Sequence, residues 1–443
     1  MISTWIRHRA GGGRAGKKQQ PDGNLNMEVT IPTHFRCPIS LDLMKDPVTL
    51  STGITYDREN IETWIEAGNQ TCPVSNQVLK SIELIPNHAI RKMIQEWCVQ
   101  NRSYGIERIP TPRIPVSPFE VSEIVSRIVS ATKRGDQIGC QALIAKIKSW
   151  GRESERNRRC IAANGTGVAL SAAFEAFATA SFEKNAGVLQ EILSALPWMF
   201  PRDPEGQSYL RSSPSLRCMV WILECGDLSG RQNAVLALKQ LLSFDQQHVD
   251  ALGKLEGVTE ALFKLIKEPI SPTATKASLA AIFYLVSSLS SSSEKIKSRL
   301  VEMGLVSLLL EILVDSSESS ICEKALGVLD SICCSNEGRE DAYSQALTMP
   351  VLVKKILRVS DLATEFSVSV LWKLCKNEKK DEGSALVEAL QVGAFQKLLL
   401  LLQVGCGEKT KEKATDLLKL LNPSRGRLEC IDSMDFKNIK RPF

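Results

Sequence analysis

Two short segments of this sequence carry cysteines in a pattern close to a metal-binding motif. Cys37-Pro38-Ile39-Ser40 and Cys72-Pro73-Val74-Ser75 both read cysteine, proline, an aliphatic residue and serine. Each looks like half of a Cys-x-x-Cys zinc knuckle in which serine replaces the second cysteine. A structural zinc site normally needs four ligands from cysteine, histidine or carboxylate. Because residues 41–71 contain neither cysteine nor histidine, we expect no metal and no cofactor here.

Polar side chains near these segments are candidates to hold the loops in place of a metal ion. They are Ser40, Asp42, Lys45, Asp46, Arg58, Ser75 and Asn76. Each hydrogen bond or ion pair is individually modest, but a mutually satisfied network is stiffer than isolated pairs. For Asp46, which precedes a proline, a simple turn-shaping role is the alternative.

The two cysteines could also suggest redox or nucleophilic chemistry. However, Cys37 and Cys72 are each followed by proline and have no histidine beside them in sequence. These surroundings favour small buried packing thiols. We therefore predict no catalytic nucleophile in this region.

The elements that position these segments form a small mixed domain over residues 31–105. Residues 48–50 and 54–56 alternate around a turn at 51–53, which predicts a β-hairpin. Two helices should follow, one capped by Asp57 and ended by Gly68, and one capped by Asn87. Their apolar faces are expected to contain Ile61, Trp64 and Ile65 in the first helix, and Ile90, Met93, Ile94 and Trp97 in the second.

A proline-rich connector separates this domain from the rest of the chain. Prolines at positions 110, 112, 115 and 118 favour an extended, semi-rigid segment, and we assign residues 106–118 to a linker. Residues 1–30 lack core-forming residues and are expected to be a disordered tail, with an organelle presequence as the alternative. Residues 426–443 are assigned to a C-terminal tail.

Residues 119–425 have the pattern of a helical repeat array. A segment similar to xAxxLxxLL recurs at intervals of 48, 43, 48, 43 and 46 residues, and a glycine follows a short helix at Gly165, Gly257, Gly304 and Gly393. A period of 40–47 with two or three helices is typical of armadillo and HEAT arrays, whose units bury their apolar faces by stacking. A helical domain that is regular by coincidence is the alternative. The recurrent small or β-branched residues are Ala186, Ala234, Ala277, Ala325, Val368 and Ala414.

Composition and charge exclude several other classes of protein. The 443 residues include 43% apolar and 24% charged residues, with too little glycine and proline for a collagenous or wholly disordered chain. A net charge of +5 indicates neither a nucleic-acid nor a membrane partner, and no apolar run approaches the ~18 residues of a membrane span. Thirteen scattered cysteines favour free thiols in a reducing compartment. We expect a cytoplasmic protein, with nuclear entry left open.

Residues 31–32, 35–41, 44–48, 53–58, 64–65, 71–74 and 84–87 together resemble a U-box, the zinc-free relative of the RING domain. With the downstream helical repeats, the chain resembles the plant U-box/armadillo-repeat E3 ubiquitin-protein ligases. The implied fold is a small α+β U-box domain, RING-like and zinc-free, followed by an all-α armadillo-type solenoid.

The resemblance implies an E3 ubiquitin transferase of the RING type. Such a protein binds a ubiquitin-charged E2 and promotes transfer to a substrate lysine without forming a thioester itself. By motif match, Ile39, Trp64 and Pro73 would form the E2-binding surface, and exposed apolar anchors on rigid loops suit such a contact. A core position is the alternative for Trp64. Asn76 occupies the place where many RING-like domains have an arginine that bridges E2 and ubiquitin, and asparagine lacks its charge and reach.

Two other functions remain open. The solenoid would hold a protein substrate in the leading hypothesis, whereas in a noncatalytic scaffold the U-box would serve only for docking or homodimerisation. An importin-like carrier is disfavoured because the expected Trp–Asn ladder is not visible. The family also suggests stress or immune signalling, but no residue selects between these pathways.

Overall fold

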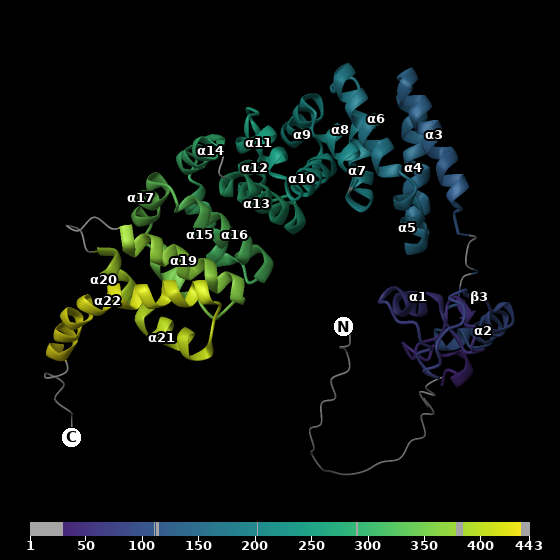
Figure 1. Ribbon diagram of the computed structural model, residues 1–443, viewed down its shortest axis with the longest axis horizontal. Coiled ribbons are helices and arrows are strands. Elements are labelled where there is room, and N and C mark those ends of the chain that lie inside the picture. The colour runs from purple at the N-terminus through teal and green to yellow at the C-terminus, as the bar shows by residue number, and fades with distance from the viewer. Residues whose placement is uncertain are drawn as a thin grey trace, which may run out of the picture. The chain divides into compact units, whose positions relative to one another are not determined.

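The structure is a computed structural model that describes residues 30–109, 111, 115–201, 203–288, 291–377 and 384–435 (Figure 1). The chain divides into two compact units, with the boundary between Ile114 and Pro115. Residues 1–29 of the expected N-terminal tail and residues 436–443 of the expected C-terminal tail lie outside the described residues.

The first unit contains a three-stranded antiparallel sheet in the order β2-β1-β3. Strands β1 (Pro47–Thr49) and β2 (Thr55–Asp57) pair with Val48 opposite Tyr56, which confirms the predicted hairpin. The third strand, β3 (Ile85–Pro86), pairs with β1 and was not anticipated, because two residues are too few for an alternating pattern.

Two α-helices and two short 3-10 helices complete the first unit. They are η1 (Thr33–Phe35), α1 (Arg58–Glu66), α2 (His88–Gln100) and η2 (Arg102–Tyr104). Asn87 caps α2 as predicted, because its side-chain oxygen accepts a hydrogen bond of 3.0 Å from the Ile90 amide. The prediction for Met93 is wrong: its side chain is 49% exposed, since the buried face of α2 is centred on Arg91, Ile94 and Cys98.

The core of the first unit extends beyond residue 105. Ile109 is buried in it, and Ile106 packs against it. In addition, the Gln95 side chain donates a hydrogen bond of 3.2 Å to the Ile109 carbonyl oxygen. Part of the range expected to be linker therefore belongs structurally to this unit. The other large buried side chains are Phe35, Met44, Val48, Leu50, Tyr56, Ile61 and Ile94.

The described part of the second unit is helical, with α3 (Pro118–Arg134) and α4 (Gln137–Glu153) followed by six groups of three helices. In chain order the groups are α5 (Glu155–Ala163), α6 (Thr166–Ser181) and α7 (Ala186–Met199); α8 (Pro204–Arg211), α9 (Ser213–Cys225) and α10 (Leu228–Leu242); α11 (Gln246–Gly253), α12 (Val258–Lys267) and α13 (Pro272–Ser287); α14 (Ser291–Glu302), α15 (Leu305–Asp315) and α16 (Ser319–Ile332); α17 (Asn336–Ser344), α18 (Thr348–Lys355) and α19 (Asp361–Asn377); and α20 (Ser384–Gln391), α21 (Ala394–Val404) and α22 (Glu408–Asp435).

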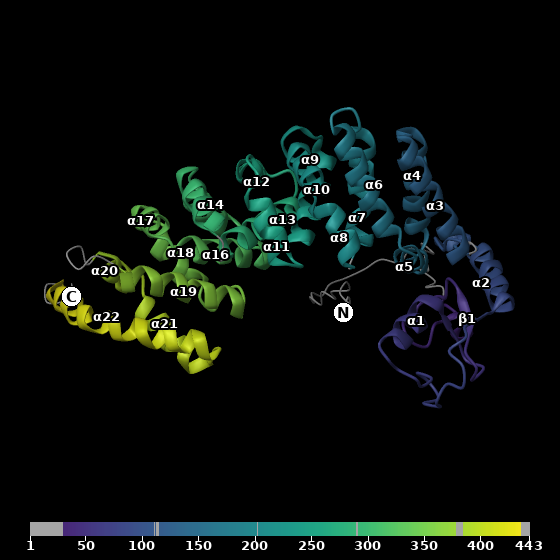
Figure 2. The same cartoon turned by 45° about the horizontal axis from the view of Figure 1, so that its top comes forward.

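The third helices of successive groups stack on one another, and α7, α10, α13, α16, α19 and α22 follow in sequence along the unit (Figures 1 and 2). The recurrent residues from Ala234 to Ala414 are buried within these helices. Ala186 instead is the first residue of α7 and only half-buried, so the first interval of 48 does not join equivalent positions. The predicted helical repeat array is confirmed.

The recurrent glycines lie between the first and second helices of their groups. Gly165, Gly257, Gly304 and Gly393 precede α6, α12, α15 and α21 with φ of 71°, 84°, 83° and 82°. Glycine adopts this left-handed conformation without the clash that a Cβ atom causes. The glycine signal in the sequence therefore marks a real turn within the repeat.

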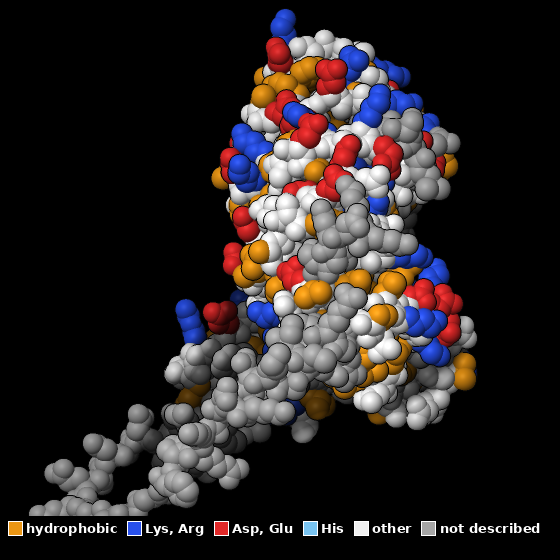
Figure 3. Space-filling model, turned by 90° about the vertical axis from the view of Figure 1, so that its left-hand side faces the viewer, with side chains coloured by type: hydrophobic (Ala, Val, Ile, Leu, Met, Phe, Trp, Pro, Cys, Tyr) orange, Lys and Arg blue, Asp and Glu red, His pale blue; other side chains and the backbone are white. Residues whose placement is uncertain are grey.

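Polar side chains also link neighbouring stacked helices. Lys148 of α4 lies 2.8 Å from the Glu191 carboxylate of α7, and Lys373 of α19 lies 2.7 Å from the Asp330 carboxylate of α16. The face shown in Figure 3 has basic and acidic side chains interspersed among hydrophobic ones. On that face, charge is therefore mixed rather than gathered into one sign.

None of the helices in the described residues is by itself both long and apolar enough to cross a membrane. Two consecutive pairs, Glu155–Ala163 with Thr166–Ser181 and Ala385–Gln391 with Ala394–Val404, reach that length and hydrophobicity only when joined, and they bend by 65° and 69° at their junctions.

Candidate partner-binding site of the first unit

The two cysteine segments fold into loops of the same backbone design. We call residues 37–42 the first loop and residues 72–77 the second loop. The Leu41 amide donates to the Cys37 carbonyl at 2.8 Å, and the Asn76 amide donates to the Cys72 carbonyl at 2.9 Å. An antiparallel bridge closes each loop, between Arg36 and Leu43 and between Thr71 and Val78. The repeated Cys-Pro-x-Ser sequence therefore has a repeated structure.

Leu41 and Asn76 occupy equivalent positions, and both have a left-handed backbone. Their φ angles are 63° and 53°. Asparagine tolerates this conformation, whereas a leucine there is strained. The Leu41 side chain is nevertheless 66% exposed, so burial does not compensate for the strain.

The first loop is held by hydrogen bonds to a cysteine sulfur. Cys37 Sγ accepts from the Asp57 amide at 3.3 Å and from Asn60 Nδ2 at 3.5 Å. Asn60 Nδ2 also donates to Ser40 Oγ at 3.1 Å. Asp42 contributes through its backbone, since its carbonyl oxygen accepts from the Cys37 amide at 2.8 Å. The buried Cys37 is thus a hydrogen-bond acceptor as well as a packing residue.

The residues just after the first loop are held by two aspartates. The Asp57 carboxylate accepts hydrogen bonds from the amides of Lys45 and Asp46 at 2.8 and 2.7 Å. The prediction that the Asp57 side chain caps α1 is therefore wrong. The Asp46 carboxylate pairs with Arg58 at 2.7 Å and also with Arg91 of α2. Asp46 therefore ties the start of the hairpin to both helices.

The second loop closes around the sulfur of Cys72. The Tyr56 hydroxyl lies 3.0 Å from Cys72 Sγ, and Thr52 Oγ1 donates to the same sulfur at 3.5 Å. The side chain and backbone of Ser75 also hydrogen-bond to this sulfur. The backbone of Val74 acts on the Tyr56 hydroxyl by lowering its pKa. Hydroxyl groups from three residues thus surround one buried sulfur.

These contacts change the acidity of both groups. Burial alone would raise the pKa of Cys72, but the hydrogen bonds from Ser75, Thr52 and Tyr56 outweigh burial and lower the pKa to about 6. Burial, together with the bond to Cys72, raises the pKa of Tyr56 well above its usual range. Tyr56 therefore remains a donor to a sulfur that is anionic near neutral pH. By contrast, burial raises the pKa of Cys140 in the second unit to about 11.

The side chains proposed from the sequence to bind a partner lie on or beside the two loops. Ile39 is 37% exposed, and Pro73 is half-buried. Trp64 is half-buried against the core, and its indole N–H donates to the Thr71 carbonyl oxygen at 2.8 Å. Asn76 is exposed at the end of the second loop.

Two further apolar side chains were missed from the sequence. Leu41 is exposed on the first loop, and Val74 is 54% exposed on the second. Aligning the two Cys-Pro-x-Ser segments would have found Val74, because it stands where Ile39 stands in the first loop. We call Ile39, Leu41, Pro73 and Val74 the apolar ledge.

No group of three or more histidine, cysteine, aspartate or glutamate side chains in the described residues is arranged to hold a metal ion. The positions near Cys37 and Cys72 are instead filled by the amide, hydroxyl and carboxamide donors described above.

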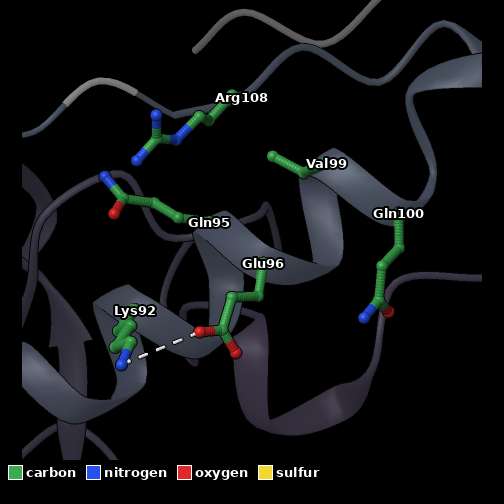
Figure 4. Close-up of a pocket in the computed structure, with 6 residues that line it drawn as sticks. All are labelled: Lys92, Gln95, Glu96, Val99, Gln100 and Arg108. Atoms are coloured by element: carbon green, nitrogen blue, oxygen red, sulfur yellow. Dashed lines mark ion pairs between the residues drawn. The ribbon is translucent and has the colours of Figure 1, made fainter.

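A separate hollow lies beside α2 in the first unit. Figure 4 shows that its walls come from one face of α2 and from Arg108. Lys92 and Glu96 form an ion pair of 3.9 Å there, and both side chains are largely exposed. No residue of either loop lines this hollow. Its lining residues are Lys92, Gln95, Glu96, Val99, Gln100 and Arg108.

Twin loops braced by hydrogen bonds on a hairpin-and-helix scaffold, followed by stacked three-helix repeats, define a protein with a U-box and an armadillo-type array. The model of the U-box domain matches residues 31–103, and the model of the plant U-box protein ARM repeat region matches residues 120–441. The chain belongs to this family of plant U-box proteins with armadillo repeats.

Similar proteins cover nearly the whole chain. It is 51% identical over 425 residues to U-box domain-containing protein 21 of Arabidopsis thaliana, covering 96% of this chain and 95% of that protein. It is 36% identical over 408 residues to E3 ubiquitin-protein ligase PUB23 of Arabidopsis thaliana, covering 90% and 94%. A crystal structure of an engineered protein shares the fold with a TM-score of 0.52 at 14% identity, covering 82% and 81%.

Proposed function

We propose that this protein is an E3 ubiquitin-protein ligase that recruits a ubiquitin-charged E2 through the apolar ledge of its U-box. The observation that carries this proposal is the exposure of Ile39, Leu41 and Val74 on the two loops. Hydrogen bonds to the buried sulfurs of Cys37 and Cys72 hold these loops in place. Relatives named as E3 ubiquitin-protein ligases support the same activity.

The ledge has the physical properties of a protein-binding surface. A few apolar side chains on a rigid base supply most of the energy of many interfaces. Rigid loops lose little conformational freedom on binding, which favours affinity. Trp64 would support the ledge through its bond to Thr71, which directly precedes the second loop, while part of its ring remains available to the partner.

The U-box would act by positioning rather than by covalent chemistry. Holding the E2–ubiquitin conjugate in an arrangement ready for attack converts a loose encounter into an oriented one, and such orientation can lower a barrier substantially. Asn76 is exposed at the end of the second loop and offers hydrogen bonds to E2 or ubiquitin. Because it carries no charge, we expect its contribution to be weaker than that of an arginine.

The repeat array would hold the substrate. Stacked repeats present a long continuous surface suited to protein partners. Lys373 of α19 is already paired with Asp330 of α16, so these two charges are less available to a substrate. We expect uncharged and apolar contacts to contribute to the substrate affinity.

Ubiquitination in a purified system tests the proposal. The full chain is incubated with E1, ubiquitin, ATP and a panel of E2 enzymes, and ubiquitin discharge is measured. We expect activity with at least one E2 and a loss of about tenfold or more in Ile39→Ala and Pro73→Ala, since a central apolar anchor is worth more than ~1.4 kcal/mol. Val99→Ala is the control, because Val99 is 56% exposed on α2 and outside the ledge. Inactivity with every E2 would favour a noncatalytic scaffold.

A further inference from the structure

The hydroxyl group of Tyr56 contacts the second loop directly before Pro73. It lies 3.0 Å from Cys72 Sγ, and the Val74 backbone acts to lower its pKa. Cys72 and Val74 are the residues directly before and after Pro73. One buried oxygen atom thus fixes the chain around a residue of the ledge.

Packing alone does not explain why this side chain is a tyrosine. Tyr56 is fully buried in the core of the first unit, among apolar neighbours. A phenylalanine ring would fill the same space, and a buried hydroxyl is unfavourable unless it is hydrogen-bonded. The ring therefore packs in the core, whereas the hydroxyl forms a hydrogen bond with the second loop.

The first loop provides an internal comparison. Its sulfur, Cys37 Sγ, is held by the backbone amide of Asp57 and by Asn60 Nδ2. Removal of the Tyr56 hydroxyl deletes none of these bonds. A change confined to that hydroxyl should consequently alter the second loop and spare the first.

We infer that Tyr56 is a positioning residue for E2 recruitment, and that its hydroxyl holds Pro73 and Val74 in the orientation that the E2 contacts. The inference rests on the proposed function and goes beyond it by assigning a role to a side chain that the E2 cannot touch. Thr52 assists from the hairpin turn through its bond to the same sulfur.

Hydrogen exchange of the full-length Tyr56→Phe variant tests the bracing without any partner. The Asn76 amide, which donates to the Cys72 carbonyl, reports on the second loop, and the Leu41 amide, which donates to the Cys37 carbonyl, reports on the first. We expect at least fivefold faster exchange in peptides covering residues 72–79 and unchanged exchange in peptides covering residues 37–44. Equal acceleration in both loops would indicate general destabilisation and overturn the inference, as would no change in either.

Measurement of E2 affinity tests the inferred role of the Tyr56 hydroxyl in E2 binding. We expect Tyr56→Phe to weaken binding of an active E2 by about fivefold to tenfold, the effect of one net hydrogen bond. In a background that carries both Pro73→Ala and Val74→Ala, the same change should weaken binding less than twofold, because the ledge residues that it positions are already lost. In an Ile39→Ala background its effect should remain complete.

These outcomes separate the inference from the proposed function. If the wild-type protein binds no E2, the proposed function fails, and hydrogen exchange still reports whether Tyr56 braces the loop. If the wild type binds E2 but Tyr56→Phe binds equally well, only the positioning role fails. Additive losses in both backgrounds would also overturn it, since they would show an effect not transmitted through the second loop.

Discussion

Tyr56 and Asp57 are consecutive residues of β2, yet they hold different loops. The Tyr56 hydroxyl reaches Cys72 of the second loop, whereas the Asp57 amide donates to Cys37 of the first. The Asp57 carboxylate additionally binds the amides of Lys45 and Asp46. The two residues use different groups, since Tyr56 reaches its loop with its side chain and Asp57 reaches Cys37 with its backbone amide. One three-residue strand thereby fixes both halves of the apolar ledge.

The strained backbone at Leu41 predicts opposite changes in stability and binding. Leu41→Asn should raise the free energy of unfolding of the first unit by about 0.5–1 kcal/mol, because asparagine tolerates positive φ. The same change should weaken E2 binding, because it removes an exposed apolar side chain from the ledge. Denaturant unfolding and E2 titration measure the two effects. A variant that is both less stable and unimpaired in binding would contradict this account.

The shared carboxylate of Asp46 should be important for folding. Asp46→Asn removes the charge that pairs with Arg58 and Arg91, and we expect a loss of about 1–3 kcal/mol in unfolding free energy because both arginines are largely buried. Asp42→Asn is the matched control, since Asp42 holds the first loop through its backbone. Equal stability of the two variants in denaturant unfolding would argue against the ion-pair role.

The pKa of Cys72 predicts a pH-dependent stability of the first unit. Its folded pKa of about 6 lies below that of a free thiol, so the folded state binds fewer protons between about pH 6 and 9. The stabilisation is therefore complete above about pH 9 and is lost as pH falls toward 6, with a slope of at most about 1.4 kcal/mol per pH unit. Unfolding of first-unit peptides, followed by hydrogen exchange in reducing buffer, measures the slope. Cys72→Ser should remove it, and identical profiles for both proteins would refute the thiolate assignment.

Glycine substitutions test the turns of the repeat array. Gly304→Ala should destabilise the second unit by about 1 kcal/mol through backbone strain alone, since φ is 83° and an added Cβ atom meets nothing within 4 Å. Gly407→Ala is the control, because its added Cβ atom also meets nothing and its φ is not positive. Thermal unfolding distinguishes them. A loss as large in Gly407→Ala would point to a cause other than the left-handed turn.

Metal removal tests the hydrogen-bonded bracing of the loops. Prolonged incubation with a chelator should leave thermal unfolding and E2-dependent activity unchanged, because the sulfurs of Cys37 and Cys72 are held by hydrogen-bond donors. Stoichiometric zinc in the purified protein, or unfolding on chelation, would contradict the metal-free description.

Local patterns in the sequence were sufficient to predict the hairpin, the Asn87 cap and the repeated helices. Each depends on residues that are close in sequence or recur at a fixed interval. The cap prediction for Asp57 shows the limit of such rules. Its carboxylate lies at the start of α1, but two backbone amides from residues 45 and 46 bind it instead.

The braces of the loops were much less predictable. Arg91 pairs with Asp46 across 45 residues of sequence, and Tyr56 meets Cys72 across 16. No periodicity links such positions, because they come together only when the hairpin and helices close on one another. The roles of the two sulfurs were also missed, since a buried cysteine is usually a packing residue.

The neighbour-by-neighbour stacking of α7, α10, α13, α16, α19 and α22 has a consequence for how such proteins diversify. Duplication or deletion of one complete three-helix module would leave each remaining module stacked on a neighbouring module. Genes of this kind can therefore change the length of the repeat array while the U-box is inherited unchanged.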